Sequence, residues 1–203
     1  MQPLGDRMLY ADLHDADLPR KLAALAPVPG YCICGDIVGS TGLKGAGLAA
    51  WVTTTLEAFT CVRSCLYAKF PPIKSIGDAL MFFIPLDAIQ GETAASLLAA
   101  SCDMAVERRI TAATRIAGVL CEEAYPITFM PGRPDYHGSD IDVAFRLLEL
   151  AGPREVVIDR RFYEAACHVG GAPLTQEFRG PWPVTIRGLN GRREIYKYVS
   201  DLA

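Results

Sequence analysis

The sequence of 203 residues is poor in histidine and tryptophan, and its seven cysteines include no Cys-x-x-Cys pair. The three histidines are scattered, so neither the histidines nor the cysteines have the ligand spacing of a structural zinc site. Cys32 and Cys34 would share one face of a strand, and Cys61 and Cys65 one face of a helix. Buried reduced thiols therefore explain these cysteines better than disulfides or a metal site do.

The sequence also lacks a basic run and a long apolar run. Its net charge is -3, and no stripe of Lys or Arg interleaved with aromatic residues is present, so we expect no nucleic-acid partner. No stretch approaches 18 apolar residues without charge, and Asp6, Arg7 and Asp12 interrupt the N-terminal region. We therefore expect no signal peptide, no membrane contact and a cytoplasmic location.

Two aspartates stand beside apolar, strand-like runs. Asp36 lies in the segment YCICGDIVGST, and Asp78 lies in KSIGDALMFF. Carboxylates at strand ends, followed by small residues whose N–H groups can face an anion, form a place for metal ions and a polyphosphate. Taken singly, Asp36 could instead cap a helix and Asp78 could occupy a hairpin turn. The pair together predicts nucleotide chemistry.

Hydrophobic periodicity predicts an α+β fold with a ferredoxin-like βαββαβ core and a smaller α/β extension at the C-terminus. Helices are expected to cover one face of the antiparallel sheet. The expected strands are 31–38, 73–76, 79–84, 114–120 and 156–158, with a strand pair over 184–199. The expected helices are 48–66, 92–112, 141–149 and 160–166, with a glycine-rich turn over 39–47.

The division of the chain follows from the first proline cluster. Residues 1–29 are predicted to form a polar leader with a short helix over 18–26, which ends at the Pro27-Val28-Pro29-Gly30 segment. Residues 30–203 are predicted to form one domain, because no linker or low-complexity segment divides them.

Three segments together resemble the catalytic domain of the class III nucleotidyl cyclases, the adenylyl and guanylyl cyclase family. They occur in the family order with family-like spacing, over roughly residues 30–199. Each would be a weak signal by itself. The segments are DIVGST (36–41), KSIGDA (74–79) and DYHGSDIDVAFRL (135–147).

The resemblance implies a two-metal site. Asp36 and Asp78 would hold two Mg2+ or Mn2+ ions, and the Ile37 carbonyl would be a further ligand. One ion would lower the pKa of the ribose 3′-hydroxyl, and the other would neutralise the triphosphate. The backbone that would bind phosphate oxygens comprises Val38, Gly39, Ser40 and Thr41.

The resemblance also implies a head-to-tail homodimer with two composite sites and an inactive monomer. Arg146 matches the family arginine that stabilises transition-state charge from the partner subunit. Its alternative role is a solvated helix face or a surface salt bridge. Arg187 lies near the position of the family's terminal phosphate-binding basic residue.

The sequence departs from the family pattern at Asp142, where an asparagine usually orients the ribose. A carboxylate only accepts hydrogen bonds and cannot copy the amide donor. Asp142 would hold the ribose differently or repel the phosphates. The family's usual strand and loop before Asp135 are also replaced, by residues 122–132.

Lys74 and Asp135 occupy the positions that read the base. A lysine donor and a carboxylate acceptor suit adenine, through N1 and the 6-amino group, and cytosine, through N3 and the 4-amino group. They also suit uracil, with Lys74 on a carbonyl oxygen and Asp135 accepting from N3–H. The size of the pocket must decide between these bases.

The chain's stand-alone length and its GSDID segment (138–142) look like the pyrimidine cyclases of bacterial Pycsar anti-phage systems. This resemblance implies conversion of UTP to cyclic UMP, a second messenger read by a separate effector protein. The alternatives are an adenylyl cyclase acting on ATP and a non-catalytic nucleotide-sensing domain. A cyclic dinucleotide synthase is set aside, because the hairpin lacks a Gly-Gly-Asp/Glu-Glu-Phe sequence.

Overall fold

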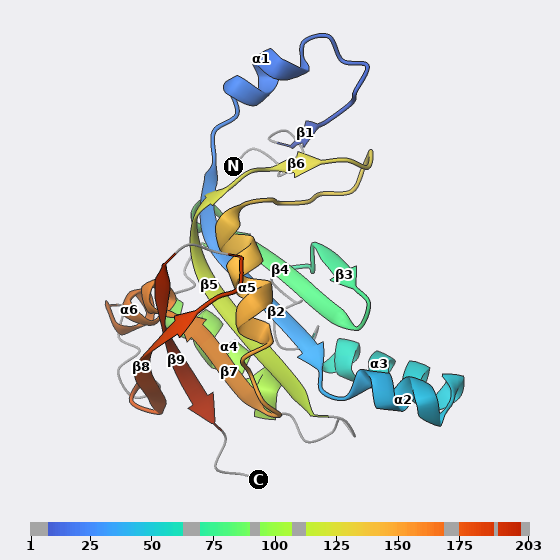
Figure 1. The fold of residues 1–203 in the computed structure, drawn as a ribbon, viewed down its shortest axis with the longest axis vertical. Helices are drawn as coiled ribbons and strands as arrows, with labels where there is room; N and C mark the ends of the chain where they lie inside the picture. The colour runs from blue at the N-terminus through green and yellow to red at the C-terminus, as the bar shows by residue number, and fades with distance from the viewer. Residues whose placement is uncertain are drawn as a thin grey trace.

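The computed structural model describes residues 8–62, 70–89, 94–106, 113–168, 175–188 and 191–199. A seven-stranded mixed sheet forms its centre (Figure 1). Its strands are β2 (Val28–Ile37), β3 (Lys74–Ile76), β4 (Ala79–Pro85), β5 (Thr114–Ala124), β7 (Glu155–Asp159), β8 (Phe178–Thr185) and β9 (Arg192–Val199). Their order is β3-β4-β2-β5-β7-β9-β8, with β5 and β7 parallel and the other neighbours antiparallel.

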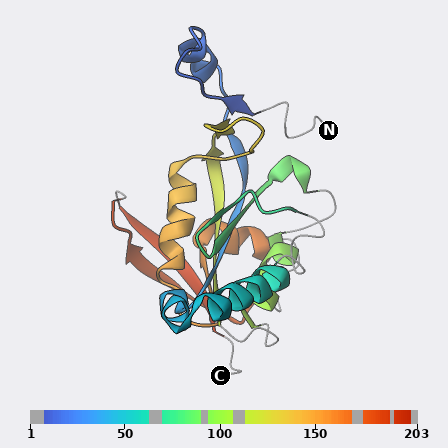
Figure 2. The same cartoon turned by 90° about the vertical axis from the view of Figure 1, so that its right-hand side faces the viewer.

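Helices cover both faces of the sheet, so the expectation of one covered face was wrong. Helices α4 (Ala94–Val106) and α6 (Arg160–His168) pack on the face that carries Tyr31 and Ile33 of β2. Helix α5 (Ser139–Leu148) packs on the face that carries Cys32 and Cys34 (Figures 1 and 2). The physical reason is the nearly continuous apolar run of β2, which needs an apolar layer on each side.

The glycine-rich segment after β2 forms a helix rather than the expected turn. Helix α2 (Ser40–Ala46) begins after Gly39, whose φ of 76° lies in the left-handed region that glycine adopts at little cost. Gly47 separates α2 from α3 (Leu48–Val62), and residues 63–66 of the predicted helix lie outside the described part. A short 3-10 helix, η3 (Leu86–Ala88), follows β4.

The N-terminal leader contains a strand that the sequence did not predict. Strand β1 (Leu9–Tyr10) pairs in parallel with β6 (Ile127–Thr128), and α1 (Leu18–Ala23) lies between β1 and β2 in the chain. Figures 1 and 2 show β1, α1 and β6 extending from one end of the molecule, with α2 and α3 toward the other. Residues 122–132, which replace the family's usual strand and loop, therefore include the short strand β6.

Several other helix and strand boundaries differ from the predicted ones. Strand β2 begins at Val28, and α1 ends at Ala23 rather than at 26. The terminal strand pair begins at Phe178 rather than at 184, because the edge strand β8 accommodates Pro181 and Pro183. For helix 92–112, only the part within α4 is described.

The expected buried thiols are confirmed at the described cysteines except Cys167, which is exposed. Cys32, Cys34 and Cys61 are buried and unbridged, whereas Cys65 lies outside the described residues. Among the helices that the structure describes, none combines the length and apolar character needed to cross a lipid bilayer.

Candidate functional site

The fold brings Asp36 and Asp78 together at one end of the sheet. Asp36 is the penultimate residue of β2, and Asp78 lies in the turn between β3 and β4. Gly35 pairs with Leu80, so the tip of the hairpin lies beside the last residues of β2. The two carboxyl groups are close enough to hydrogen-bond to each other.

The two carboxyl groups have opposite electrostatic environments. Burial, and then Asp78, raise the pKa of Asp36, while hydrogen bonds from Arg115 oppose this change. Burial would also raise the pKa of Asp78, but hydrogen bonds from Ser40 and Asp36, with the charge of Lys44, hold it below its usual value. One carboxyl of the pair is therefore easier to ionise than the other.

Arg115 is a site residue that the sequence interpretation missed. Its Nε and Nη2 atoms both donate to Oδ2 of Asp36, at 2.9 and 2.6 Å. Arg115 is the cross-strand partner of Asp36 on β5, so both side chains lie on the same face of the sheet. Only a correct register between β2 and β5 could have identified it.

The carbonyl oxygen of Ile37 points toward the tip of the β3–β4 hairpin. Val38 donates its N–H to the Ala113 carbonyl at 2.9 Å, so this N–H faces the β5 side of β2. In a trans peptide the preceding carbonyl points the opposite way. Because β4 lies on the other side of β2, the Ile37 oxygen faces the side where Asp78 lies.

The donor set at this end of the sheet fits a hard divalent cation. Two adjacent, partly buried carboxylates and one backbone oxygen are the ligands that Mg2+ and Mn2+ prefer. Within the described ranges, no group of three or more His, Cys, Asp or Glu side chains could hold a metal. Further ligands would have to be backbone, water or substrate oxygens, as is usual where Mg2+ binds with a nucleotide.

The segment from Val38 to Thr41 follows these ligands directly. Gly39 accepts hydrogen bonds on its carbonyl from the N–H groups of Gly42 and Leu43, which starts the first turn of α2. Gly39 and Thr41 are exposed, and the Ser40 side chain bonds to Asp78. The structure thus places the four predicted phosphate-binding residues next to the aspartate pair.

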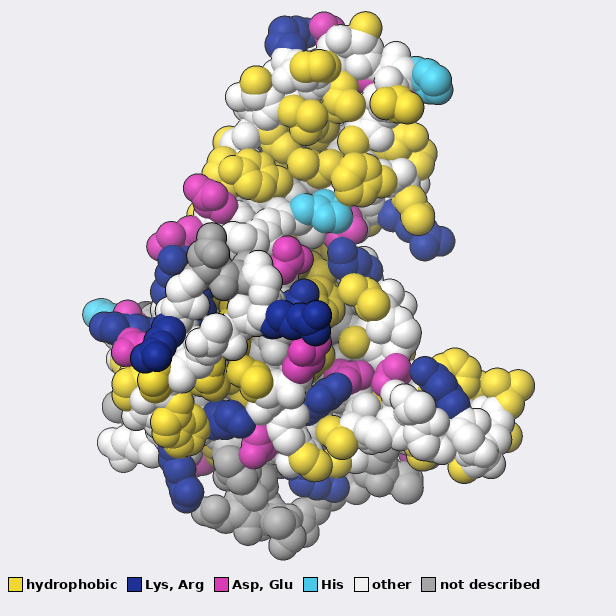
Figure 3. Space-filling model, viewed as in Figure 1, with side chains coloured by type: hydrophobic (Ala, Val, Ile, Leu, Met, Phe, Trp, Pro, Cys, Tyr) yellow, Lys and Arg dark blue, Asp and Glu magenta, His cyan; other side chains and the backbone are white. Residues whose placement is uncertain are grey.

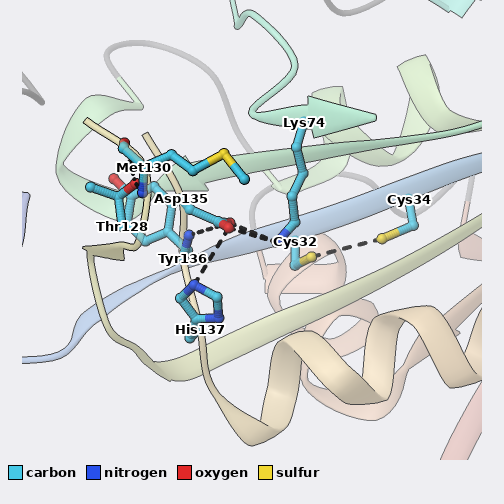
Figure 4. A network of polar contacts seen from close by, with 8 residues as sticks. All are labelled: Cys32, Cys34, Lys74, Thr128, Met130, Asp135, Tyr136 and His137. Carbon is cyan, nitrogen blue, oxygen red and sulfur yellow. Dashed lines mark hydrogen bonds and ion pairs between the residues drawn. The ribbon is translucent and has the colours of Figure 1, made fainter. Parts of the chain in front are cut away.

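Lys74 and Asp135 form an ion pair beside a pocket. Lys74 Nζ lies 2.7 Å from Oδ1 and 3.0 Å from Oδ2 of Asp135, and Figure 4 shows the two side chains meeting. The Tyr136 N–H donates to Oδ1 at 2.8 Å and fixes the carboxylate. The pocket measures about 470 Å³ and is lined by Ile73, Lys74, Ser75, Thr128, Phe129, Met130, Gly132, Arg133, Pro134 and Asp135.

His137, which made no pattern in the sequence, lies against this ion pair. Its Nε2 is 3.4 Å from Oδ2 of Asp135 and is buried without a hydrogen-bond partner among the described residues (Figure 4). Its ring meets Phe129 edge-on, with 5.2 Å between the ring centres. Proximity to Asp135 in the sequence was the only available signal.

Asp142, Arg146 and Arg187 are exposed side chains that do not bond to the aspartate pair within the described part of one chain. Asp142 and Arg146 are exposed one turn apart on α5, and Arg187 is exposed just after β8. In the described part of the chain, none of the three makes a hydrogen bond or ion pair with Asp36 or Asp78. Within one chain these three residues are therefore not bonded to the predicted metal ligands.

No protein-family model and no curated protein matches the sequence. Solved structures do match. The adenylyl cyclase CyaB from P. aeruginosa has a TM-score of 0.72 at 17% identity, over 86% of this chain and 95% of that one. The guanylyl cyclase Cya2 has a TM-score of 0.69 at 16% identity, over 88% and 96%.

Adenylate cyclases from Trypanosoma brucei, in their monomeric state, give a TM-score of 0.66 at 14% identity, over 86% of this chain and 92% of that one. Identities this low establish a shared fold and leave activity to be argued from the site. The expected α+β architecture is confirmed, and the chain has the fold of the class III adenylyl and guanylyl cyclase catalytic domains.

Proposed function

We propose that this chain is a metal-dependent nucleotidyl cyclase, which converts a nucleoside triphosphate to its 3′,5′-cyclic nucleotide and pyrophosphate. The observation that carries the proposal is the meeting of Asp36 and Asp78 on the sheet face that also presents Lys74. Lys74 pairs with Met81, Met81 pairs with Cys34, and Asp36 follows Cys34 by two residues. Side chains two residues apart on a strand share a face, so one nucleotide could contact both groups.

The metal end of the proposed site consists of Asp36, Asp78 and the Ile37 carbonyl. Two bound Mg2+ or Mn2+ ions would supply activation of the 3′-hydroxyl and neutralisation of phosphate charge. Arg115 and Lys44 offset the carboxylate charges, and the backbone from Val38 to Thr41 offers N–H groups to phosphate oxygens.

The base end consists of Lys74 and Asp135 at the wall of the pocket. Lys74 donates and Asp135 accepts, and the apolar side chains of Ile73, Phe129 and Met130 can pack on the faces of a base. This division of a site into a charged metal end and a half-apolar base end fits the chemistry of a nucleoside triphosphate.

Two copies of the chain would complete the site. Arg146 and Asp142 are exposed on α5, where a second copy can present them to the triphosphate and ribose of its partner. Arg187 is proposed as a phosphate contact from the same region. We therefore propose a head-to-tail homodimer with two composite sites.

The substrate that we favour is UTP, with cyclic UMP as a messenger made in the cytoplasm during anti-phage defence and read by a separate effector. The support is the resemblance of the GSDID segment, which places Asp142 at the ribose position, to the pyrimidine cyclases of Pycsar systems. The Lys74–Asp135 pair is compatible with uracil as well as with adenine. In this proposal residues 30–203 are the catalytic domain and residues 1–29 are a leader.

Two alternatives follow from specific observations. The adenylyl cyclase CyaB has the same fold, which supports ATP as the substrate. Asp142, which cannot donate a hydrogen bond to the ribose, supports a domain that binds nucleotide without turning it over.

One experiment separates these possibilities. The purified protein is incubated with Mn2+ and each of ATP, GTP, CTP and UTP in turn, and the products are identified by mass spectrometry. The Asp36→Ala variant is the control. Cyclic UMP is the expected product, and cyclic AMP would support the first alternative. No product with intact nucleotide binding would overturn cyclase activity in favour of the sensing domain.

A further inference from the structure

The wall of the base pocket is a loop that the main sheet holds at its base. Tyr125 and His137 form an isolated antiparallel bridge, with hydrogen bonds of 2.7 and 3.0 Å between their backbone groups. The chain between them leaves the sheet, forms β6 and returns through the pocket-lining residues to Asp135. The bridge holds the two ends of this loop at the sheet, but it does not hold the outer part of the loop.

The outer part is held by β1 from the N-terminal leader. Leu9 donates its N–H to the Pro126 carbonyl, and Ala11 donates its N–H to the Thr128 carbonyl, both at 2.9 Å. In the register of the pair, Leu9 faces Ile127 and Tyr10 faces Thr128. The first residues of the chain that the structure describes therefore bond to a wall of the proposed base pocket.

Thr128 transmits this contact to the pocket. Its side chain is 5% exposed and lines the pocket. The Thr128 hydroxyl donates to the Met130 carbonyl at 2.8 Å and accepts the Met130 N–H at 3.1 Å (Figure 4). The Arg133 N–H then donates to the Met130 carbonyl at 3.2 Å, which closes the turn that leads to Asp135.

Backbone bonds hold β1 to β6, Met8 just before β1 packs against the core, and the other side chains of this region add little buried area. Tyr10, Phe129 and Met130 are 43%, 65% and 61% exposed, and α1 buries none of its side chains. Figure 3 shows hydrophobic side chains on the surface over this end of the molecule. Two-residue strands with so little buried area are marginally stable, so the loss of one hydrogen bond should loosen the wall.

We propose that the leader, through β1, positions the wall of the base pocket and so sets the affinity for the nucleotide and the discrimination between bases. The inference rests on the proposed function, because it takes the pocket to be the base site. It gives the leader a role in substrate binding, whereas the metal end of the site, built on β2 and the β3–β4 hairpin, is independent of it.

The test uses two proline variants at neighbouring positions of β1 and the residue after it, of which only one loses a hydrogen bond to β6. Ala11→Pro removes the N–H that donates to Thr128. Tyr10→Pro is the matched control, because N–H groups of successive strand residues point to opposite sides and the Tyr10 N–H points away from β6. An edge strand accommodates proline at Tyr10, where the N–H does not face β6, whereas proline at Ala11 removes an N–H that does.

Hydrogen–deuterium exchange of residues 125–135 is the readout that does not depend on turnover. Ala11→Pro should speed exchange at Met130 and Arg133 severalfold, and Tyr10→Pro should leave it unchanged. Equal exchange in the two variants and the wild type would overturn the inference, whether or not the protein is a cyclase.

Turnover supplies the second readout. Ala11→Pro should raise the KM for the cyclised nucleotide about three- to tenfold, with kcat within about twofold of the wild type. The ratio of kcat/KM between UTP and ATP should also shrink. Faster exchange with an unchanged KM and ratio would contradict the binding role. A wild type that produces no cyclic nucleotide would instead refute the proposed function, while the exchange result would still report on the contact between the leader and the pocket wall.

Discussion

At the scale of single residues, the first prediction concerns the two aspartates at the metal end of the proposed site. Asp36→Ala or Asp78→Asn should lower Mn2+-dependent formation of cyclic nucleotide by about a hundredfold or more, because a metal ligand is lost. Neither substitution should prevent dimer formation. Asp36→Ala should also lower the melting temperature, because it removes the carboxylate that accepts two hydrogen bonds from the half-buried Arg115. The checks are mass spectrometry of the product and thermal unfolding. Undiminished product from either variant would remove the metal assignment.

The buried carboxyl group of Asp159 should make the free energy of unfolding depend on pH. Burial raises its pKa from 3.8 to about 6, against opposing hydrogen bonds from the N–H groups of Phe162 and Leu120. Between these two values the folded protein holds a proton that the unfolded chain has released. The free energy of unfolding should therefore fall as pH rises from about 4 to about 6, by up to about 3 kcal/mol.

Asp159→Asn should abolish this dependence, because the amide oxygen still accepts both N–H bonds and carries no charge. Urea denaturation of the variant and the wild type, at steps of pH between 4 and 7, measures the difference. Asp103→Asn changes an exposed carboxylate on α4 and is the matched control. Parallel stability curves for Asp159→Asn and the wild type would show that the buried carboxyl group does not titrate in this range.

At the scale of elements, Gly77 controls where the hairpin places Asp78. Its φ of 63° is left-handed, and no atom of the described residues lies within 4 Å of the position that a Cβ would take, so only backbone strain opposes a side chain there. Gly77→Val should lose about 1–2 kcal/mol of stability and lower kcat/KM, because the turn must shift. Gly77→Asn is the matched control, since asparagine tolerates this conformation. Equal activity of the two variants would show that the turn does not position Asp78.

The elements that the sequence predicted are those with a strong hydrophobic pattern. The apolar run of β2, the hairpin around Asp78 and the helix that carries Arg146 all have such patterns. Strands β1 and β6 are two residues long, too short for any periodicity, and β8 is interrupted by two prolines. Tertiary pairing alone forms these strands, so the contact between the leader and the pocket wall could not be seen in the sequence.

The same limit applies to the site. Recognisable sequence segments contain Asp36, Asp78, Lys74 and Asp135. The fold brings Asp36 next to Asp78, and Lys74 next to Asp135. Arg115 and His137 depend on a strand register and on a loop path, which side-chain chemistry alone does not encode. Hydrophobic pattern thus predicted the scaffold, side-chain chemistry and the family resemblance pointed to the motif residues, and neither identified Arg115 and His137, which contact them.

At the scale of the whole molecule, the proposal that a partner chain supplies Arg146 to the aspartate pair leads to a prediction about mixed dimers. Asp36→Ala and Arg146→Ala should each be inactive alone. In a mixture, half of randomly formed dimers are mixed, and each mixed dimer holds one intact site, with Asp36 from one chain and Arg146 from the other. Re-association of the two variants should therefore restore about a quarter of the wild-type rate.

The measurement follows the rate as the two variants are titrated against each other, with differently tagged chains to count the mixed dimers. A site contained within one chain gives no recovery, because each chain then lacks one essential residue. Lack of activity in counted mixed dimers would therefore place Arg146 and Asp36 in the same chain's site. Recovery in proportion to the mixed fraction would mean that Arg146 on the exposed face of α5 contacts the partner's nucleotide. Dimerisation itself would then control the catalytic rate.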